Sequence, residues 1–194
     1  MVCTINIEKH KKFDKIYPIR NTNDYIALTN TSEIVYIEHD VTNNTIDTFI
    51  NNGVITSKTE LVKNILAVYN SNKQLLVFNL QEVKLKHSFQ TPFLELNVTS
   101  LKYFSISPDC HYLSLFEQPK FLSLYRLIDC SKCASILLYS EIDAMIITEK
   151  FVSLAMTNRR ILSYLIVDPL EENHEKRVEE LPSRYILVTS FFYF

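Results

Sequence analysis

Four segments of the chain repeat one pattern, in which two short apolar runs flank a polar turn. The pattern is clearest in Tyr112–Leu115, FEQPKF and Leu122–Tyr125, and similar segments occupy 65–78 and 151–164. A fourth segment, 25–37, has a connection one residue shorter. Aromatic and β-branched runs with polar turns between them indicate antiparallel hairpins. Four such hairpins in register, three of them with the same connection length, favour a repeated β architecture.

The spacing of the segments narrows the choice of repeat. A small residue recurs in the first strand of each segment, at Ala27, Ala67, Ser114 and Ser153, and these positions are 40, 47 and 39 residues apart. A four-stranded propeller blade needs roughly 40–45 residues. Armadillo and HEAT repeats have similar lengths but are helical, whereas the repeated segments here have strand composition.

One stretch carries a family resemblance. Phe104–Asp109, FSISPD, followed by the apolar run Tyr112–Phe116, resembles the first-strand end, turn and second strand of a WD40-type β-propeller blade. The Trp-Asp pair of that family is absent, and Phe78-Asn79, Tyr125-Arg126 and Tyr164-Leu165 stand in the equivalent places. The Gly-His element is missing too, so the Asp-His-Ser/Thr-Trp hydrogen-bond network of the family is not assigned here.

A narrower resemblance concerns Arg159–Arg184. This segment ends a strand at Val167–Pro169 before a charged insertion, and it is similar to the propeller region of NACHT-and-WD-repeat proteins, whose blades are also degenerate. In that family the nucleotide-binding module lies elsewhere in a much longer chain. No P-loop occurs in this sequence.

These observations predict an all-β fold of about four four-stranded antiparallel propeller-like blades in an open or incomplete ring. The resemblance implies that residues 1–194 are a single partial WD40-like β-propeller, and the apolar ending leads us to expect a fragment of a longer protein. The expected blades are 21–57, 58–94, 95–143 and 144–169, followed by a charged loop at 170–184 and the start of a further strand at 185–194.

Composition excludes several classes of partner. The chain has 194 residues, of which 47% are hydrophobic and 22% charged, as in globular proteins. Its formal net charge of −2 provides no basic field, so no nucleic-acid partner is expected. No run approaches the roughly 20 apolar residues of a membrane-spanning helix, and the first residues lack the apolar core of a secretory signal. We therefore expect no membrane partner and a cytoplasmic location.

Local patterns predict several individual elements. Gly53 is the only glycine, so asparagine is expected to take left-handed positions in the turns TNTSE and YNSNK. Leu75–Leu80 predicts a strand buried on both faces. Val83–Phe89 alternates apolar and polar residues, which predicts an outer strand with one face in water. Thr59–Asn64 fits either a helical turn or a strand.

Cys130 and Cys133 have the only spacing typical of redox or metal chemistry. A zinc site needs two more ligands, and the remaining cysteines and histidines offer no second paired spacing. The redox motif usually begins a helix, whereas these cysteines follow a strand. A structural role is favoured, and redox or zinc chemistry through Cys130 and Cys133 remains the alternative.

Other polar residues give weaker indications of chemistry. His111 follows Asp109 and Cys110, but adjacent residues of a strand point to opposite faces, and no third group is indicated that would orient a Cys-His pair. The carboxylates of Glu141, Asp143 and Glu149 show no sign of a shared pocket. No catalytic, metal or cofactor site is therefore assigned, and no cofactor is expected.

The expected function is a non-catalytic protein–protein interaction scaffold, because loops on a rigid sheet framework present variable contacts. Arg159 and Arg160 lie at a predicted hairpin tip, and arginine is favoured in interfaces, so they are the candidate partner contacts. A second alternative to this function is a membrane-associated chain that uses the apolar segment Tyr185–Phe194.

Overall fold

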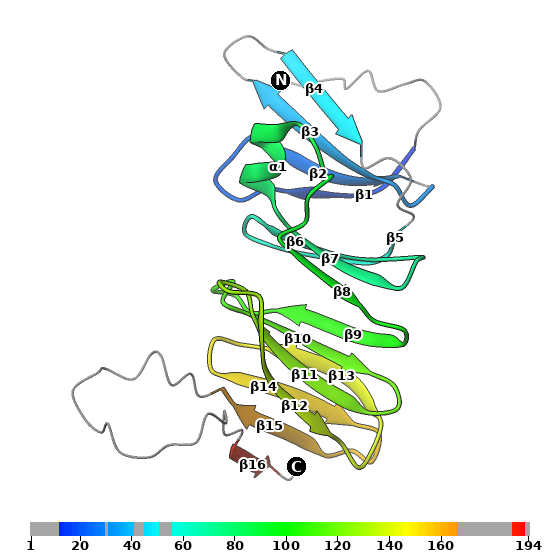
Figure 1. Ribbon diagram of the computed structural model, residues 1–194, viewed down its shortest axis with the longest axis vertical. Coiled ribbons are helices and arrows are strands. Elements are labelled where there is room, and N and C mark those ends of the chain that lie inside the picture. The colour runs from blue at the N-terminus through cyan, green and yellow to red at the C-terminus, as the bar shows by residue number, and fades with distance from the viewer. Residues whose placement is uncertain (1–11, 30, 41–44, 51–55, 167–187, 193–194) are drawn as a thin grey trace, which may run out of the picture. The chain divides into compact units, whose positions relative to one another are not determined.

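The computed structural model describes residues 12–29, 31–40, 45–50, 56–166 and 188–192 of the chain. Within these residues there are sixteen strands and one helix (Figure 1). The strands form four four-stranded antiparallel sheets, and each sheet is a meander in which chain neighbours pair. The expected all-β class with four four-stranded antiparallel sheets is confirmed.

The sheets are numbered in chain order. The first consists of β1 (Phe13–Pro18), β2 (Tyr25–Thr29), β3 (Ile34–Asp40) and β4 (Thr45–Ile50). The second consists of β5 (Thr56–Val62), β6 (Ile65–Asn70), β7 (Gln74–Asn79) and β8 (Leu94–Asn97), with helix α1 (Leu80–Lys86) between β7 and β8. The third consists of β9 (Leu101–Ile106), β10 (Tyr112–Glu117), β11 (Phe121–Arg126) and β12 (Ser131–Leu137). The fourth consists of β13 (Ile142–Ile147), β14 (Phe151–Met156), β15 (Ile161–Leu165) and β16 (Val188–Phe192).

The chain divides into two compact units, Met1–Val98 and Thr99–Phe194, each containing two sheets. The charged segment 170–184 lies outside the described residues. Beyond it, β16 lies in the expected further strand and pairs with β15, so it is the fourth strand of the fourth sheet.

The repeated hairpins predicted from the sequence are present in all four sheets. In each sheet the recurring small residue lies in the second strand and pairs with a residue of the third. The pairs are Ala27 with Val35, Ala67 with Val77, Ser114 with Leu124, and Ser153 with Ser163. Leu75–Phe78 of β7 is buried throughout, as the apolar run Leu75–Leu80 predicts, but the strand ends at Asn79 and Leu80 begins helix α1.

Left-handed turn positions are taken by residues other than glycine. Positive φ angles occur at nine described non-glycine residues, which are Asn21, Ser32, Lys63, Lys73, His87, Cys110, Lys120, Cys130 and Arg159. The expectation that asparagine takes this position in YNSNK is wrong, because Lys73 has the φ of 61°. Asn70 closes that turn through its side chain instead, and its Oδ1 accepts a hydrogen bond of 2.9 Å from the amide of Gln74. In the first hairpin Ser32 has a φ of 61°, and Asn30 lies outside the described residues.

The outer strand predicted at Val83–Phe89 is wrong, because helix α1 covers most of it. Asn79 caps the helix by accepting a 3.0 Å hydrogen bond from the amide of Gln81. Leu80 and Val83 are buried and lie three residues apart, so they share one helical face, whereas Leu85 is 82% exposed. At 59–64 the strand alternative is correct, since β5 extends to Val62.

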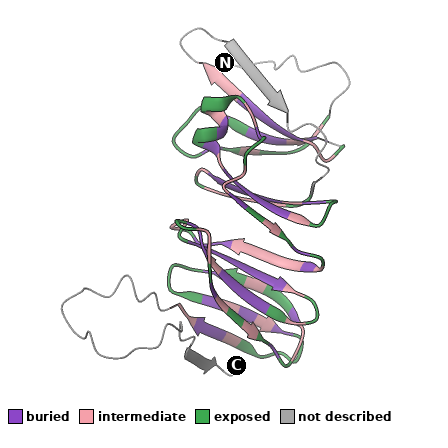
Figure 2. Cartoon of the chain, in the orientation of Figure 1, coloured by how far each residue is buried: buried purple, intermediate pink, exposed green. Residues whose placement is uncertain are grey.

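Each unit has its own hydrophobic cluster, visible as buried residues in the sheets of Figure 2. In the first unit the cluster joins both sheets and the helix, with members such as Ile34, Tyr36, Phe78, Leu80 and Val83. In the second unit the cluster joins the third and fourth sheets, with members that include Tyr112, Phe116, Leu122, Val152 and Leu154.

Candidate functional site

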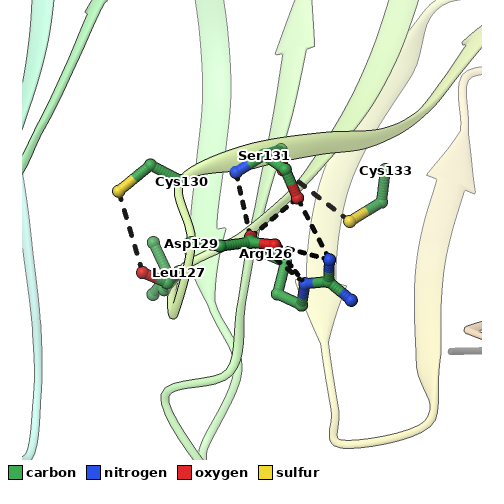
Figure 3. Close-up of polar contacts among 6 residues, drawn as sticks. All are labelled: Arg126, Leu127, Asp129, Cys130, Ser131 and Cys133. Carbon is green, nitrogen blue, oxygen red and sulfur yellow. Dashed lines mark hydrogen bonds and ion pairs between the residues drawn. The ribbon is translucent and has the colours of Figure 1, made fainter. Parts of the chain in front are cut away.

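Of the two cysteines in the sequence motif, Cys130 lies in the turn between β11 and β12 and Cys133 lies in β12. An ion pair between Arg126 and Asp129 organises this turn (Figure 3). The Arg126 Nε lies 3.1 Å from both carboxylate oxygens of Asp129, and the Arg126 Nη2 also donates to Oδ2. Ser131 donates to Asp129 Oδ1 from its amide at 3.1 Å and from its hydroxyl at 2.7 Å. The hydrogen bond from Arg126 is the main cause that holds the pKa of the Asp129 carboxyl well below its ordinary value.

In the view of Figure 3, the thiols of Cys130 and Cys133 lie on either side of the Asp129 side chain. The Cys130 Sγ donates to the carbonyl of Leu127 at 3.8 Å, and the Cys133 Sγ donates to the carbonyl of Ser131 at 3.7 Å. Cys133 is buried within β12, and neither cysteine is in a disulfide. The two thiols thus donate to the carbonyls of different residues, and their sulfur atoms are not bonded to each other.

The electrostatics of Cys130 oppose nucleophilic chemistry. Burial raises the pKa of its thiol, and the negative charge of Asp129 raises it further. A reactive cysteine instead needs a lowered pKa, because the thiolate is the reacting form. Among the described residues no group of three histidine, cysteine, aspartate or glutamate side chains is placed to hold a metal ion.

The Ser-Pro-Asp turn between β9 and β10 is closed by its own side chains. The Asp109 Oδ1 accepts from the Ser107 hydroxyl and, at 3.1 Å, from the amide of His111. The Ser107 Oγ accepts in turn from the amide of Tyr112 at 2.9 Å. The ring Nδ1 of His111 lies 3.3 Å from Asp109 Oδ2, a contact that the sequence reasoning did not anticipate. His111 therefore faces a carboxylate, and the fully buried Ser107 supports the turn.

Arg159 and Arg160 lie in the tight turn between β14 and β15, as predicted. The amide of Arg159 donates to the carbonyl of Met156 at 3.0 Å, and the amide of Met156 donates to the carbonyl of Arg160 at 2.8 Å. Asn158 Oδ1 accepts from the amide of Arg160 at 3.2 Å. Both arginines are exposed, and Arg159 has a φ of 64°. The hairpin therefore presents two neighbouring cations to solvent.

The carboxylates named from the sequence do not share a pocket. Glu141 lies 3.3 Å from the ammonium of Lys102 in β9, and that ammonium also donates to the carbonyl of Ile142 at 2.9 Å. The Tyr103 hydroxyl donates to the backbone carbonyl of Asp143 at 2.6 Å, so the carboxylate of Asp143 is not the acceptor. These contacts join the third and fourth sheets. Glu149 is exposed at the β13–β14 turn.

The first unit contains a buried carboxylate that sequence reasoning missed. Asp24 is 2% exposed, and its Oδ2 accepts from the Tyr36 hydroxyl and from the Lys84 ammonium, each at 2.9 Å. Its Oδ1 accepts from the amide of His39 at 3.2 Å, and Lys84 also lies 3.0 Å from Glu38 Oε1. The hydrogen bond to Asp24 is the main cause that raises the pKa of Lys84, whereas burial is the main cause for Tyr36. The cluster joins helix α1 to the first sheet.

No protein-family model and no curated protein matches the chain in sequence. Solved structures match its fold. The β-propeller domain of Cps50 (Swd1) from Myceliophteria thermophila has a TM-score of 0.51 at 7% identity, over 73% of this chain and 52% of that one. Sqt1 from Chaetomium thermophilum has a TM-score of 0.55 at 14% identity, over 77% and 43%. A chain of the Mitotic Checkpoint Complex has a TM-score of 0.53 at 10% identity, over 76% and 48%.

In fold, the chain is similar to WD40 β-propeller domains, as the FSISPD stretch implied. At these identities the likeness concerns the fold alone. The chain spans about half the length of the solved chains it matches, since the matches cover 52%, 43% and 48% of those chains. Within the described residues, no helix has the length and apolar character needed to cross a membrane.

Proposed function

We propose that the chain is a non-catalytic scaffold that binds a protein partner and acts in the cytoplasm. The fold supports this, because tight hairpins on rigid sheets present their loops in fixed positions. One of the similar structures is a chain of the Mitotic Checkpoint Complex, which is an assembly of proteins. The fold alone does not identify the binding surface, whereas differences in burial within the second unit do indicate one.

One face of the fourth sheet is partly exposed, and this supports the proposal: its apolar ends are exposed, whereas Ser163 at its centre is buried. Cross-strand pairing places Phe151 with Leu165, Ser153 with Ser163 and Ala155 with Ile161 on this face. We name these six residues the outer face of the fourth sheet. Along β14 they alternate with Val152 and Leu154, which are buried in the cluster of the second unit. At opposite ends of the outer face, Phe151 is 39% exposed and Ile161 is 38% exposed.

The third sheet shows what equivalent positions look like when another sheet covers them. In the third sheet, Tyr112 occupies the position equivalent to Phe151, and Leu122 occupies the position equivalent to Ile161. Tyr112 and Leu122 are each only 3% exposed. They belong to the hydrophobic cluster shared with the fourth sheet. The outer face of the fourth sheet therefore has apolar residues at its ends, like the equivalent face of the third sheet, but these residues are less buried. Exposed apolar residues of this kind are typical of a binding surface.

Charge indicates the chemistry of the partner. Arg160 directly precedes Ile161, and Arg159 and Arg160 are both exposed at that end of the outer face. Arginine is enriched in protein interfaces and pairs bidentately with carboxylates. We infer that the partner presents an apolar surface bordered by aspartate or glutamate side chains, and that Arg159 and Arg160 contact those carboxylates.

The other functions considered from the sequence have less support. The thiols of Cys130 and Cys133 each donate to a different backbone carbonyl rather than facing a shared ligand, which weakens the redox and zinc alternative. Of the apolar segment 185–194, residues Val188–Phe192 form strand β16 and pair with β15, which gives that stretch a place in a sheet. The narrower resemblance to NACHT-and-WD-repeat proteins rests on 159–184, much of which lies outside the described residues, and it contributes nothing to this proposal.

Site-specific photocrosslinking tests the proposal. A photoreactive residue placed at Ile161 of the full chain should capture one protein, and the variants Ile161→Glu and Arg160→Glu should no longer bind that protein. Leu85→Glu is the matched control, since Leu85 is an exposed apolar residue on α1 in the other unit, and it should bind normally. Equal loss of binding in Leu85→Glu, or a dimer of the chain crosslinked through Ile161, would contradict a partner of different sequence at this face.

A further inference from the structure

The first unit contains a solvent-open hollow of about 360 Å³ that the scaffold function does not use. Its walls come from three segments. Arg20, Asn21 and Thr22 lie between β1 and β2, Lys63 and Asn64 lie between β5 and β6, and Gln81 lies in the first turn of α1. The two strand connections are equivalent, since each joins the first and second strands of its sheet.

The lining is cationic and contains no carboxylate. Arg20 and Lys63 come from different sheets and contribute one positive charge each, and the other four lining side chains are amides and a hydroxyl. Neither Arg20 nor Lys63 forms a hydrogen bond or ion pair with another described residue. Lys84 of the same unit differs, because its ammonium is bound to Asp24 and Glu38. The donors of Arg20 and Lys63 are thus available to a ligand.

Hydrogen bonds hold the wall of the hollow in place. The Asn64 Nδ2 donates to the Asn79 Oδ1 at 3.1 Å, and the amide of Leu80 donates to the carbonyl of Asn64 at 2.8 Å. The Thr22 hydroxyl donates to the carbonyl of Ile19 at 3.0 Å. The two bonds of Asn64 attach the connection that contains Lys63 to the start of α1. The bond of Thr22 closes the turn that contains Arg20. The charged side chains project from a framework that is already formed.

We propose that this hollow binds a phosphate group. Two cations from separate segments match the two negative charges of a phosphate dianion better than they match the single charge of a carboxylate ligand. Guanidinium presents a planar fork of donors to phosphate oxygens, and lysine adds a compact positive charge. The hollow has a volume of about 360 Å³, whereas a water molecule occupies about 30 Å³ in the liquid. The hollow therefore has room for more than phosphate itself. The site therefore accommodates the phosphate as a free ion or as the end group of a phosphorylated protein side chain.

Amide NMR of the full chain tests the site directly. Addition of inorganic phosphate, with ionic strength held constant by chloride, should shift the amides of Asn21, Lys63, Asn64 and Gln81. Arg20→Gln and Lys63→Asn should each weaken phosphate binding about tenfold, because each removes one charged hydrogen-bond donor. Asparagine is chosen at Lys63 because the φ of 52° there favours it over most residues.

Arg159→Asn provides a matched control, since it also removes a cation from a left-handed turn position, with a φ of 64°, but in the other unit. It should leave phosphate binding unchanged. An absence of phosphate-dependent shifts at the four amides, or equal weakening by Arg159→Asn, would overturn the site. Neither result bears on partner binding at the fourth sheet, which is measured separately by crosslinking.

A second titration distinguishes the two sources of phosphate. A short peptide containing phosphoserine is compared with its unphosphorylated form and with inorganic phosphate. Tighter binding of the phosphopeptide than of inorganic phosphate assigns the site to phosphorylated proteins. Equal affinity, with no binding of the unphosphorylated peptide, assigns it to the phosphate ion alone. Equal binding of both peptides contradicts a phosphate site.

Discussion

The ammonium of Lys84 lies 2.9 Å from the carboxylate of Asp24, although 60 residues separate them in the sequence. Lys84 is on α1, which follows the third strand of the second sheet, whereas Asp24 precedes the second strand of the first sheet. Asp24 is almost completely buried, so the charge of Lys84 compensates a carboxylate that water does not reach. The pair thus links the helix to a different sheet from the one it follows.

Replacement of Lys84 should destabilise the first unit. Lys84→Met leaves the buried Asp24 with only the Tyr36 hydroxyl and the His39 amide as donors, so the free energy of unfolding should fall by about 1–2 kcal/mol. Lys86→Met is the control, because its pair with Glu82 joins side chains that are 54% and 53% exposed. That variant should change stability by less than about 0.5 kcal/mol. Urea unfolding measures the free energy of unfolding of both variants. Equal losses in the two variants would show that the Asp24 contact stabilises the chain no more than the exposed pair does.

Stability should also fall in alkali. The pKa of Lys84 is raised above its ordinary 10.5, chiefly by its hydrogen bond to Asp24, and burial raises the pKa of Tyr36 above 10.0. The folded chain therefore keeps protons that the unfolded chain releases. This contribution to stability is complete below the unfolded pKa values and is lost as pH rises through the folded ones.

The pH dependence can be assigned with two variants. Lys84→Met and Tyr36→Phe should each show a smaller loss of unfolding free energy above pH 10.0 than the unaltered chain. Part of the loss should remain in both, because burial also raises the pKa of Tyr125 and Tyr164. Urea unfolding at a series of pH values provides the measurement. Identical slopes in all three chains would contradict the assignment.

Cys130 should react slowly with alkylating reagents at neutral pH. Its thiol pKa is raised by burial and by the Asp129 charge, so little thiolate is present. Mass spectrometry after timed alkylation should show slower labelling of Cys130 in the folded chain than in the same chain in urea. Rapid labelling of the folded chain, or a disulfide between Cys130 and Cys133 after mild oxidation, would instead favour the redox alternative.

Glycine at Lys73 should stabilise the second sheet. Lys73 has a φ of 61°, a conformation that costs a residue with a Cβ about 1 kcal/mol or more. The greater freedom of glycine in the unfolded chain offsets part of the gain, so Lys73→Gly should raise the unfolding free energy by about 0.5 kcal/mol. Asn72 in the same turn does not have a positive φ, so Asn72→Gly relieves no strain and should leave the unfolding free energy unchanged or lower it. Thermal unfolding would contradict this if both variants behaved alike.

The sequence was sufficient for features that depend on neighbouring residues. The hairpins that contain Ala67 and Ser114 follow from apolar runs and short polar connections, and their cross-strand pairs match the predicted repeat. The exposed turn at Arg159 and Arg160 follows from the same local pattern. Such hairpins pair residues close in sequence, so the pattern alone carries the necessary information.

Features that depend on distant residues were not predictable in this way. Val83 and Leu85 alternate as in a strand, but the segment forms a helix that buries Leu80 and Val83 in one cluster with residues of the first sheet. The contact between Asp24 and Lys84 needs the fold to bring them together, and an isolated aspartate before a strand gives no sign of it. The hollow between Arg20 and Lys63 likewise joins connections from two sheets.

The position of α1 also has a consequence for synthesis on the ribosome. Ile34 and Tyr36 of the first sheet are buried in one cluster with Leu80 and Val83 of the helix. In a nascent chain that contains only the first sheet, Leu80 and Val83 have not yet been synthesised, and neither has Lys84, whose charge compensates Asp24. The first sheet is therefore expected to complete its core only after α1 has left the ribosome, so that the first two sheets mature together as one cotranslational folding step.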